Sequence, residues 1–329
     1  MCIVFWTFDH PDYSLILCSN RDEYLSRPTK DAAFHSFEHD HEAHSNAPGA
    51  ILSGIDEMGG GTWLGLSRTG KVAVLTNITE AFDPSVITSR GSLVSSFLLL
   101  ESDEPFEEQV RQCFPRDAKY SGFNLLLFAP RVVPATSSQS SDLELRYDNS
   151  SLVTNGGACG PITSRQLSAK ERSCGGFSNG VDGVDGDGSE WPKVTHGLRD
   201  LENLISQVTQ ASNKQTDESE LADRLFELLS WKSPEPLTER SQLRNTVEVV
   251  PLPATWGSGR AEYYGTRLST VLLIRRDGQV TFIERDIWKL VDGKVTRWGG
   301  NIGNSNNKSP TNTPSERTFR FQLDLRSPS

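Results

Sequence analysis

Short apolar segments separated by polar turns occupy the first quarter of the chain. Residues 2–8 and 14–20 are rich in β-branched, aromatic and aliphatic side chains, and they flank the turn-forming sequence Asp9-His10-Pro11-Asp12. This pattern predicts two strands joined as a hairpin. Further strand-like segments, separated by glycine-containing turns, follow at 50–55, 63–66 and 71–77.

Apolar residues at helical spacing occur in pairs of segments between the strand-rich blocks. The segment 93–100 suits a helix that is buried on most of its circumference, and 104–113 carries a second helical pattern that ends before Pro115. Two amphipathic helices are predicted at 198–206 and 221–231. Paired helices differ from the strict β-α-β alternation that is typical of a parallel sheet.

The remaining strands are predicted in the middle and at the end of the chain. Residues 122–129 form a mostly apolar run, as expected for a strand covered on both faces. Alternation of polar and apolar residues over 318–325 predicts a last strand at a sheet edge. Two further hairpins, one of them around the turn Asp277-Gly278, are predicted from strands at 143–147 and 151–154, and at 270–275 and 279–285.

The order of these elements predicts an α+β fold. Hairpin-sized blocks of strands alternate with pairs of helices, which favours largely antiparallel sheets covered by helices. We expect one domain over residues 1–329, with two stacked sheets and helices on the outside. Polar segments that cannot bury enough surface to offset their ordering entropy are expected to be flexible inserts, at 36–47, 135–142, 181–190, 210–220 and 299–315.

Composition and charge narrow the class of protein. The polar inserts account for a hydrophobic content of only 36% and a mean hydropathy of -0.44 in a chain of 329 residues. The net charge of -10 would repel phosphate groups, so nucleic-acid binding is not expected. The apolar runs are too short for a transmembrane helix, which needs about 20 residues.

Cysteine usage and the first residues indicate the compartment. The five cysteines form no Cys-x-x-Cys pair, which fits a reducing environment and argues against a disulfide framework. The chain starts with neither the basic residues of a secretory signal nor an arginine-rich transit peptide. We therefore expect a cytoplasmic protein, with import into an organelle by an uncleaved signal left open. No metal site is expected, because nothing in the histidine-rich segment 35–44 imposes one geometry.

Cys2 is the residue whose position carries most chemical information. Removal of Met1 would make it the N-terminal residue, with a thiol nucleophile and an α-amine whose pKa of about 8 suits a general base. If residues 2–8 and 14–20 pair as a hairpin, Cys2 lies near Cys18 to Asp22. The alternative interpretation is a small buried hydrophobe on the first strand.

Charged and amide side chains follow the predicted strands near this point. Arg21 and Asp22 would place a guanidinium and a carboxylate beside the thiol, as thiolate chemistry requires. Asn77, at the end of the segment 71–77, could offer its amide to an oxyanion. The alternatives are a loop ion pair between Arg21 and Asp22 or Glu23, and an ordinary turn residue at Asn77.

Several motifs together resemble the NRDE family. The chain begins with Met1-Cys2-Ile3 and carries the family's four-letter signature at Asn20-Arg21-Asp22-Glu23. The likeness continues over nearly the whole chain, at Arg27-Pro28, 52–56 (LSGID), 60–65 (GGTWLG), 75–77 (LTN), 122–125 (GFNL), 178–180 (SNG), 264–267 (YGTR) and 281–285 (TFIER).

The resemblance implies a fold and a set of site residues. The implied fold is that of an N-terminal-nucleophile hydrolase, a four-layer αββα sandwich, and within that superfamily the sequence resembles the cysteine amidases that include penicillin V and bile-salt acylases. Cys2 takes the place of the nucleophile. The positions that match a charged pair, two asparagines near the oxyanion and a late arginine are Arg21, Asp22, Asn77, Asn179 and Arg267.

For function, the resemblance implies hydrolysis of an amide or thioester acyl bond in a small molecule, without a cofactor. It also associates the chain with Golgi organisation, protein secretion, lipid homeostasis and haem trafficking, and with a Golgi or mitochondrial location. The alternative is a non-catalytic protein that carries haem or a lipid acyl group in the same pocket, with Cys2 as a haem ligand or as part of an apolar lining. Removal of Met1 separates the two, because only hydrolysis needs the free amine.

Overall fold

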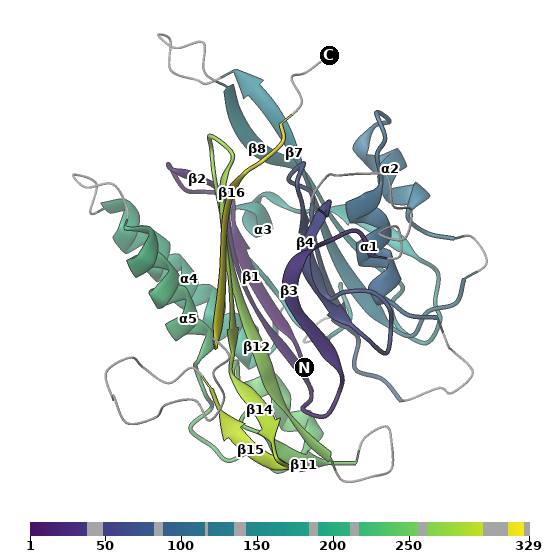
Figure 1. The fold of residues 1–329 in the computed structure, drawn as a ribbon, viewed down its shortest axis with the longest axis vertical. Helices are drawn as coiled ribbons and strands as arrows, with labels where there is room; N and C mark the ends of the chain where they lie inside the picture. Colours follow the sequence, from purple (N-terminus) through teal and green to yellow (C-terminus); the bar gives the residue numbers. More distant parts are fainter. Residues whose placement is uncertain are drawn as a thin grey trace.

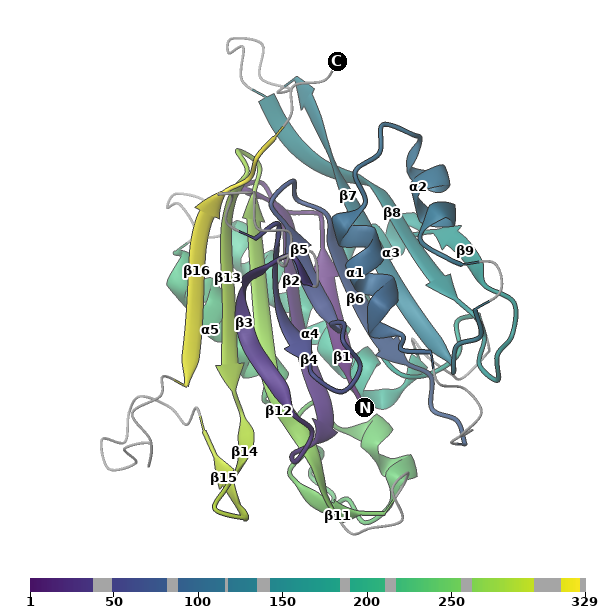
Figure 2. The same ribbon diagram turned by 45° about the vertical axis from the view of Figure 1, so that its right-hand side comes forward.

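Two β-sheets of seven strands each lie face to face in the centre of the protein (Figures 1 and 2). The computed structural model describes residues 1–37, 49–81, 88–115, 118–134, 143–183, 190–210, 217–255, 262–298 and 315–325. Within these residues every strand pairing is antiparallel, as the hairpin-sized blocks predicted.

Sheet A contains both ends of the described chain. Its strands are β1 (Ile3–Thr7), β2 (Tyr13–Tyr24), β10 (Gly175–Phe177), β11 (Leu252–Ala254), β12 (Glu262–Arg275), β13 (Gln279–Asp286) and β16 (Glu316–Gln322). Their order is β10-β1-β2-β12-β13-β16, with β11 paired to β12. The predicted first hairpin is confirmed, since Ile3 lies opposite Asn20 and Thr7 opposite Ile16. The prediction of a last strand at a sheet edge is also confirmed, by β16.

Sheet B follows the order of the sequence. Its strands are β3 (Thr29–His35), β4 (Ile51–Asp56), β5 (Leu64–Ser67), β6 (Val72–Asn77), β7 (Phe123–Pro134), β8 (Leu143–Thr154) and β9 (Thr163–Gln166). The hairpin predicted between 143–147 and 151–154 is wrong, because these residues form the single strand β8. The polar interruption marks an irregularity in its pairing with β7, where Ala129 lies opposite Asn149 and Arg131 opposite Arg146.

Helices cover the outer face of each sheet and complete the predicted αββα sandwich (Figure 1). Side chains of α1 (Gly91–Leu99) and α2 (Phe106–Gln112) pack on sheet B, and those of α4 (Pro192–Gln210) and α5 (Glu218–Leu229) pack on sheet A. The other elements are the short helices α3 (Ala169–Ser173) and η3 (Arg240–Asn245) and a separate hairpin of β14 (Trp288–Val291) and β15 (Lys294–Arg297).

The predicted inserts fall mostly outside the described residues. The exception is 210–220, whose flanks are helical: Gln210 ends α4, and the side chain of Asp217 caps the N-terminus of α5 by accepting a hydrogen bond from Ser219 N. The two helices therefore extend into the flanks of this predicted insert, while 211–216 lie outside the described residues. Within the described part of the chain, no helix is long and apolar enough to cross a bilayer.

Alternation along β1 determines what surrounds the start of the chain. Ile3 and Phe5 point into the core beneath α4 and α5, whereas Val4 and Trp6 point into the core between the two sheets. Met1 belongs to the core beneath α4 and α5. The first residues therefore lie where helix, sheet A and the space between the sheets meet.

Candidate functional site

The end of β2 lies beside the first residues of the chain. Asn20 to Glu23 lie at the end of the second strand, as predicted, but β2 continues through Tyr24 and not only to residue 20. These polar residues stay within the strand because they pair with β12, where Asp22 lies opposite Thr266. Successive side chains of a strand point to opposite faces, so Arg21 and Asp22 approach the start of the chain from different sides.

The α-ammonium group of Met1 occupies a buried polar site. It lies 3.1 Å from Oδ2 of Asp22, whose side chain is fully buried, and it donates a hydrogen bond to the hydroxyl of Tyr264. The hydroxyl of Thr266 donates to the other oxygen of Asp22 over 2.6 Å. Burial lowers the pKa of the Met1 amine, and the negative charge of Asp22 opposes that effect.

Lys193, on α4, holds the carbonyl group of Met1. Its Nζ donates to the Met1 carbonyl oxygen over 2.7 Å, and its side chain has no exposed surface. The helix approaches β1 closely because Gly197, one turn later, leaves room for the ring of Phe5; a Cβ atom there would lie 2.1 Å from the ring. Burial lowers the pKa of Lys193 to about 8, against the opposing influence of Asp22.

Cys2 is half-buried between these groups. Its Sγ lies 3.8 Å from the carbonyl oxygen of Asp22, and its own carbonyl oxygen accepts a hydrogen bond of 2.7 Å from Ser178. Burial raises the pKa of the Cys2 thiol, while the neighbouring ammonium group and Arg21 act in the opposite direction. With Met1 in place, the thiol is therefore protonated at neutral pH.

Arg21 and Arg267 form a cationic group on the side of the site that faces sheet B. The guanidinium of Arg21 lies 4.0 Å from the ring centre of Trp63, and Nη1 atoms of both arginines donate to the hydroxyl of Thr29, over 3.1 and 3.2 Å. Arg267 reaches this position because it falls at an irregularity in the pairing of β12 with β2. Burial, reinforced by Arg21, lowers the pKa of Arg267 to about 10.

The alternative interpretation was an ion pair between Arg21 and Asp22 or Glu23. In the structure, Glu23 pairs with Arg27 instead. Its carboxylate lies 3.7 Å from Arg27, which is bound more closely by Asp56 at 2.7 Å. Among the described residues no ion pair joins Arg21 to Asp22. Arg21 and Asp22 therefore contact different groups. Arg21 lies against Trp63 and Thr29, whereas Asp22 binds the ammonium group of Met1.

Asn77 and Asn179 lie together, next to Ser178. The Nδ2 atom of Asn179 donates to the carbonyl oxygen of Asn77, and the carbonyl oxygen of Asn179 accepts from Thr79 N over 2.8 Å. Ser178, next in sequence, binds the Cys2 carbonyl. The structure thus brings five of the six predicted site residues around the start of β1, with Arg267 placed beside Arg21.

Sequence reasoning missed three residues of this site. Tyr264 stands at the start of the YGTR motif, so a signal for it was present. Trp63 lies within GTWLG and was interpreted as packing below a turn. Lys193 gave no signal, since a lysine on an amphipathic helix is normally exposed.

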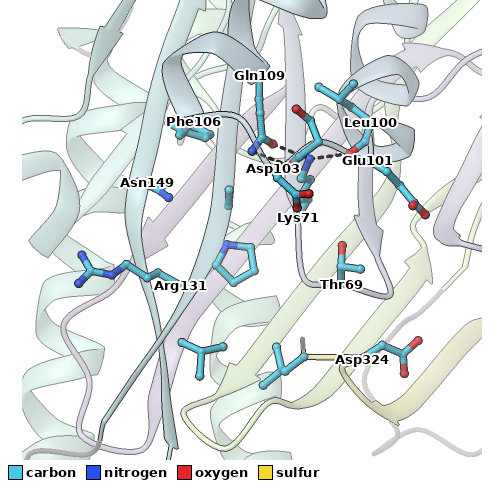
Figure 3. A pocket seen from close by; sticks show the side chains of 15 residues that line it. Thr69, Lys71, Leu100, Glu101, Asp103, Phe106, Gln109, Arg131, Asn149 and Asp324 are labelled. Atoms are coloured by element: carbon cyan, nitrogen blue, oxygen red, sulfur yellow. Dashed lines mark hydrogen bonds between the residues drawn. The ribbon is translucent and has the colours of Figure 1, made fainter. Parts of the chain in front are cut away.

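Two described cavities lie away from Cys2. One, of about 390 Å³, is lined by Lys71, whose Nζ donates to Leu100 O over 2.7 Å and to Gln109 Oε1 over 2.8 Å (Figure 3). The other, of about 800 Å³, is lined by Glu144 and Arg276 among others. Neither is lined by a predicted site residue, and the described residues contain no group of three or more metal-ligating side chains.

Solved structures that are similar in fold include two enzymes. Penicillin V acylase from Agrobacterium tumefaciens is 12% identical, with a TM-score of 0.48 over 87% of this chain and 83% of that chain. A Caenorhabditis elegans orthologue of N-acylethanolamine-hydrolysing acid amidase is 10% identical, with a TM-score of 0.44 over 83% of this chain and 92% of that chain.

Closer relatives are found by sequence. The Bos taurus protein named Transport and Golgi organization protein 2 homolog is 30% identical over 310 residues, which cover 91% of this chain and 96% of the relative. The Drosophila melanogaster Transport and Golgi organization protein 2 is 27% identical and covers 86% of this chain and 91% of the relative. The family described as Transport and Golgi organisation 2 matches residues 1–289. By this match and by the NRDE residues at the end of β2, the chain belongs to the Transport and Golgi organisation 2 family.

Proposed function

We propose that this protein hydrolyses an amide or thioester acyl bond, with Cys2 as the nucleophile after Met1 has been removed. The observation that carries the proposal is the buried carboxylate of Asp22, which lies 3.1 Å from the N-terminal ammonium group. A fully buried carboxylate is costly unless a cation compensates it. Here that cation is the ammonium group of Met1, next to Cys2. Once Met1 has been removed, the chain terminus near this carboxylate would be the α-amine of Cys2, as an N-terminal nucleophile needs.

The reaction follows from the positions of these groups. The α-amine of Cys2 takes the proton of its own thiol, and the sulfur attacks the acyl carbonyl carbon to form a carbon–sulfur bond and an oxyanion. The intermediate collapses and expels an amine or a thiol, which takes the proton back from the ammonium group. Water, deprotonated by the same amine, then attacks the acyl-enzyme and releases the carboxylic acid and the thiol of Cys2.

Side chains around Cys2 supply the remaining contributions. The amides of Asn77 and Asn179 are the proposed donors to the oxyanion, since the two residues lie together and Asn179 follows Ser178, which binds the Cys2 carbonyl. Arg21 stabilises the thiolate electrostatically, because its positive charge lowers the pKa of Cys2. Arg267 holds Arg21 in place through the hydroxyl of Thr29 that the two share.

Modification by an acyl donor tests the proposal. Protein that begins at Cys2 is incubated with an activated aryl ester, and the adduct is mapped by peptide mass spectrometry. We expect one acyl group on Cys2 that is lost with time, and no adduct on Cys2→Ala. Acylation of surface lysines alone, at equal rates in both proteins, would refute a nucleophilic role for Cys2.

Family relatives carry names that refer to transport and Golgi organisation. We propose that the acyl substrate is a lipid or lipid-linked metabolite, so that its turnover affects lipid homeostasis and secretion. We further propose a cytoplasmic protein with Golgi or mitochondrial association. Fractionation of cells that express the chain with a C-terminal tag, which leaves the N-terminus unmodified, tests the location.

The second candidate function is binding or trafficking without catalysis, and the burial of Met1 favours it. Met1 is 6% exposed and contacts Asp22 and Lys193 through both of its backbone groups. In that form burial raises the pKa of the Cys2 thiol, so ligation of haem iron would have to displace the thiol proton. Retention of Met1 in protein from its own host would support this candidate.

A further inference from the structure

Lys193 is a buried charge that the mechanism above leaves without a role. It lies in the first turn of α4 with no exposed surface, where lysine is rare unless paired. Among the described residues, its hydrogen-bond acceptor is the carbonyl oxygen of Met1. That oxygen belongs to the peptide bond whose nitrogen becomes the α-amine of Cys2 when Met1 is removed.

We propose that Lys193 is a positioning residue that keeps the freed α-amine of Cys2 unprotonated at neutral pH. The inference rests on the proposed function, in which this amine is the general base. Removal of Met1 takes away both the carbonyl that binds Lys193 and the ammonium that binds Asp22. The side chains of Lys193 and Asp22 then both face the new amine, with opposite charges.

The charged groups around this amine come from several elements. At the Met1 amine of the present structure, Asp22 on β2 favours protonation and Lys193 on α4 opposes it, and the same two charges would act on the freed amine one residue later. Arg21 on β2 and Arg90 before α1 add positive charge near Cys2. Tyr264 on β12 stays neutral, because burial raises its pKa well above the ordinary range.

Without Lys193, the carboxylate of Asp22 would have the new ammonium as its nearest cation. An ammonium group cannot accept the proton of the thiol, so the base would be lost at neutral pH. With Lys193 present, the carboxylate is compensated by a cation that has no part in proton transfer. The lysine thereby separates two tasks, charge balance and base catalysis.

A merely structural role for Lys193 makes a different prediction. Such a role needs a hydrogen-bond donor in this position but not a positive charge. Lys193→Gln keeps a donor and loses the charge, whereas Lys193→Met loses both while filling a similar volume. Lys71→Met is the matched control, since Lys71 is a partly buried lysine on sheet B with acceptors remote from Cys2.

The experiment measures the pKa of the amine directly. Full-length protein beginning at Cys2 is labelled with ¹⁵N-cysteine, and the chemical shift of the α-amine nitrogen is followed against pH. We expect the amine pKa to rise by about one unit or more in both Lys193 variants, and to stay unchanged in Lys71→Met. Thermal denaturation verifies that each variant is folded. If Lys193→Met does not fold, the amine pKa is compared in Lys193→Gln alone.

The outcomes separate this inference from the proposed hydrolysis. A wild-type pKa of the Cys2 amine in Lys193→Gln would show that the lysine acts only as a hydrogen-bond donor, and it would overturn the inference. Wild-type values in both variants would overturn it as well. The titration needs no acyl transfer. If the pKa rises in the variants while no acyl donor ever modifies Cys2, Lys193 does tune the amine and the proposed hydrolysis is wrong.

Discussion

Met1 is expected to be removable only before the chain folds. A methionine aminopeptidase needs the first amine and peptide bond in its own active site. In the folded chain Met1 is 6% exposed, its ammonium is paired with Asp22, and its carbonyl oxygen is bound by Lys193. The hydroxyl of Thr79 also donates to its sulfur over 3.1 Å. All three contacts must break, and the side chain must leave the core, before the residue can be cleaved.

The size of this protection follows from the contacts. Withdrawal of a buried methionine side chain costs about 2 kcal/mol. Separation of the buried pair leaves Asp22 uncompensated, which costs about 3 kcal/mol. The sum of about 5 kcal/mol corresponds to an open fraction of about 1 in 4,000, at 1.4 kcal/mol per factor of ten. Cleavage of the folded protein should therefore be about three orders of magnitude slower than cleavage of an unfolded peptide.

The assay follows intact mass during incubation with purified methionine aminopeptidase. Met1-bearing protein is obtained from a host in which that enzyme is inhibited, and a peptide of residues 1–12 gives the unprotected rate. In Asp22→Asn, loss of the ion pair should speed cleavage of the folded protein by about two orders of magnitude. Cleavage of the folded wild-type protein within about tenfold of the peptide rate would show that these contacts do not protect Met1.

Three further predictions concern stability and turnover. Asp22→Asn in the Met1-bearing chain leaves two buried ammonium groups without a carboxylate, so the free energy of unfolding in urea should fall by about 3 kcal/mol. The exposed control Asp324→Asn should change that free energy by less than about 0.5 kcal/mol. Equal losses in the two variants would contradict the prediction. Folding lowers the pKa of Lys193 from 10.5 to about 8, so between these pH values the unfolded chain binds more protons than the folded chain. The free energy of unfolding of the wild type, relative to that of Lys193→Met, should therefore rise by up to about 3 kcal/mol from pH 8 to pH 10.5. A flat or falling difference would count against a buried charged lysine. Asn179→Ala should slow acyl turnover roughly a hundredfold, with Asn149→Ala as a control outside the site; turnover of Asn179→Ala within about twofold of the wild type would exclude a role at the oxyanion.

Local patterns predicted the parts of the fold that local physics determines. The turn at 9–12 between two apolar runs is sufficient to specify the pairing of β1 with β2, and the alternation over 318–325 identified an edge strand. The prediction for 143–154 was wrong because the polar residues near Asn149 resemble a turn. They are instead an irregularity that long-range pairing with β7 stabilises, and such pairing has no local signature.

The candidate site was predictable to the extent that its residues lie near one another in sequence or in a family motif. Hairpin pairing brings Cys2 beside Arg21 and Asp22 whatever the rest of the chain does. Lys193 reaches Met1 only because α4 packs against β1 at Gly197. The sequence of α4 carries the amphipathic pattern but not the point of contact, so the buried lysine could not be distinguished from an exposed one.

Hydrolysis by Cys2 is best tested by the intact mass of the protein purified from its own host, before and after incubation with an acyl donor. We expect a mass that corresponds to a start at Cys2, and one additional acyl group that maps to Cys2 and is absent from Cys2→Ala. Retained Met1 with no adduct on Cys2 would contradict hydrolysis. The site would then be one that binds without catalysis.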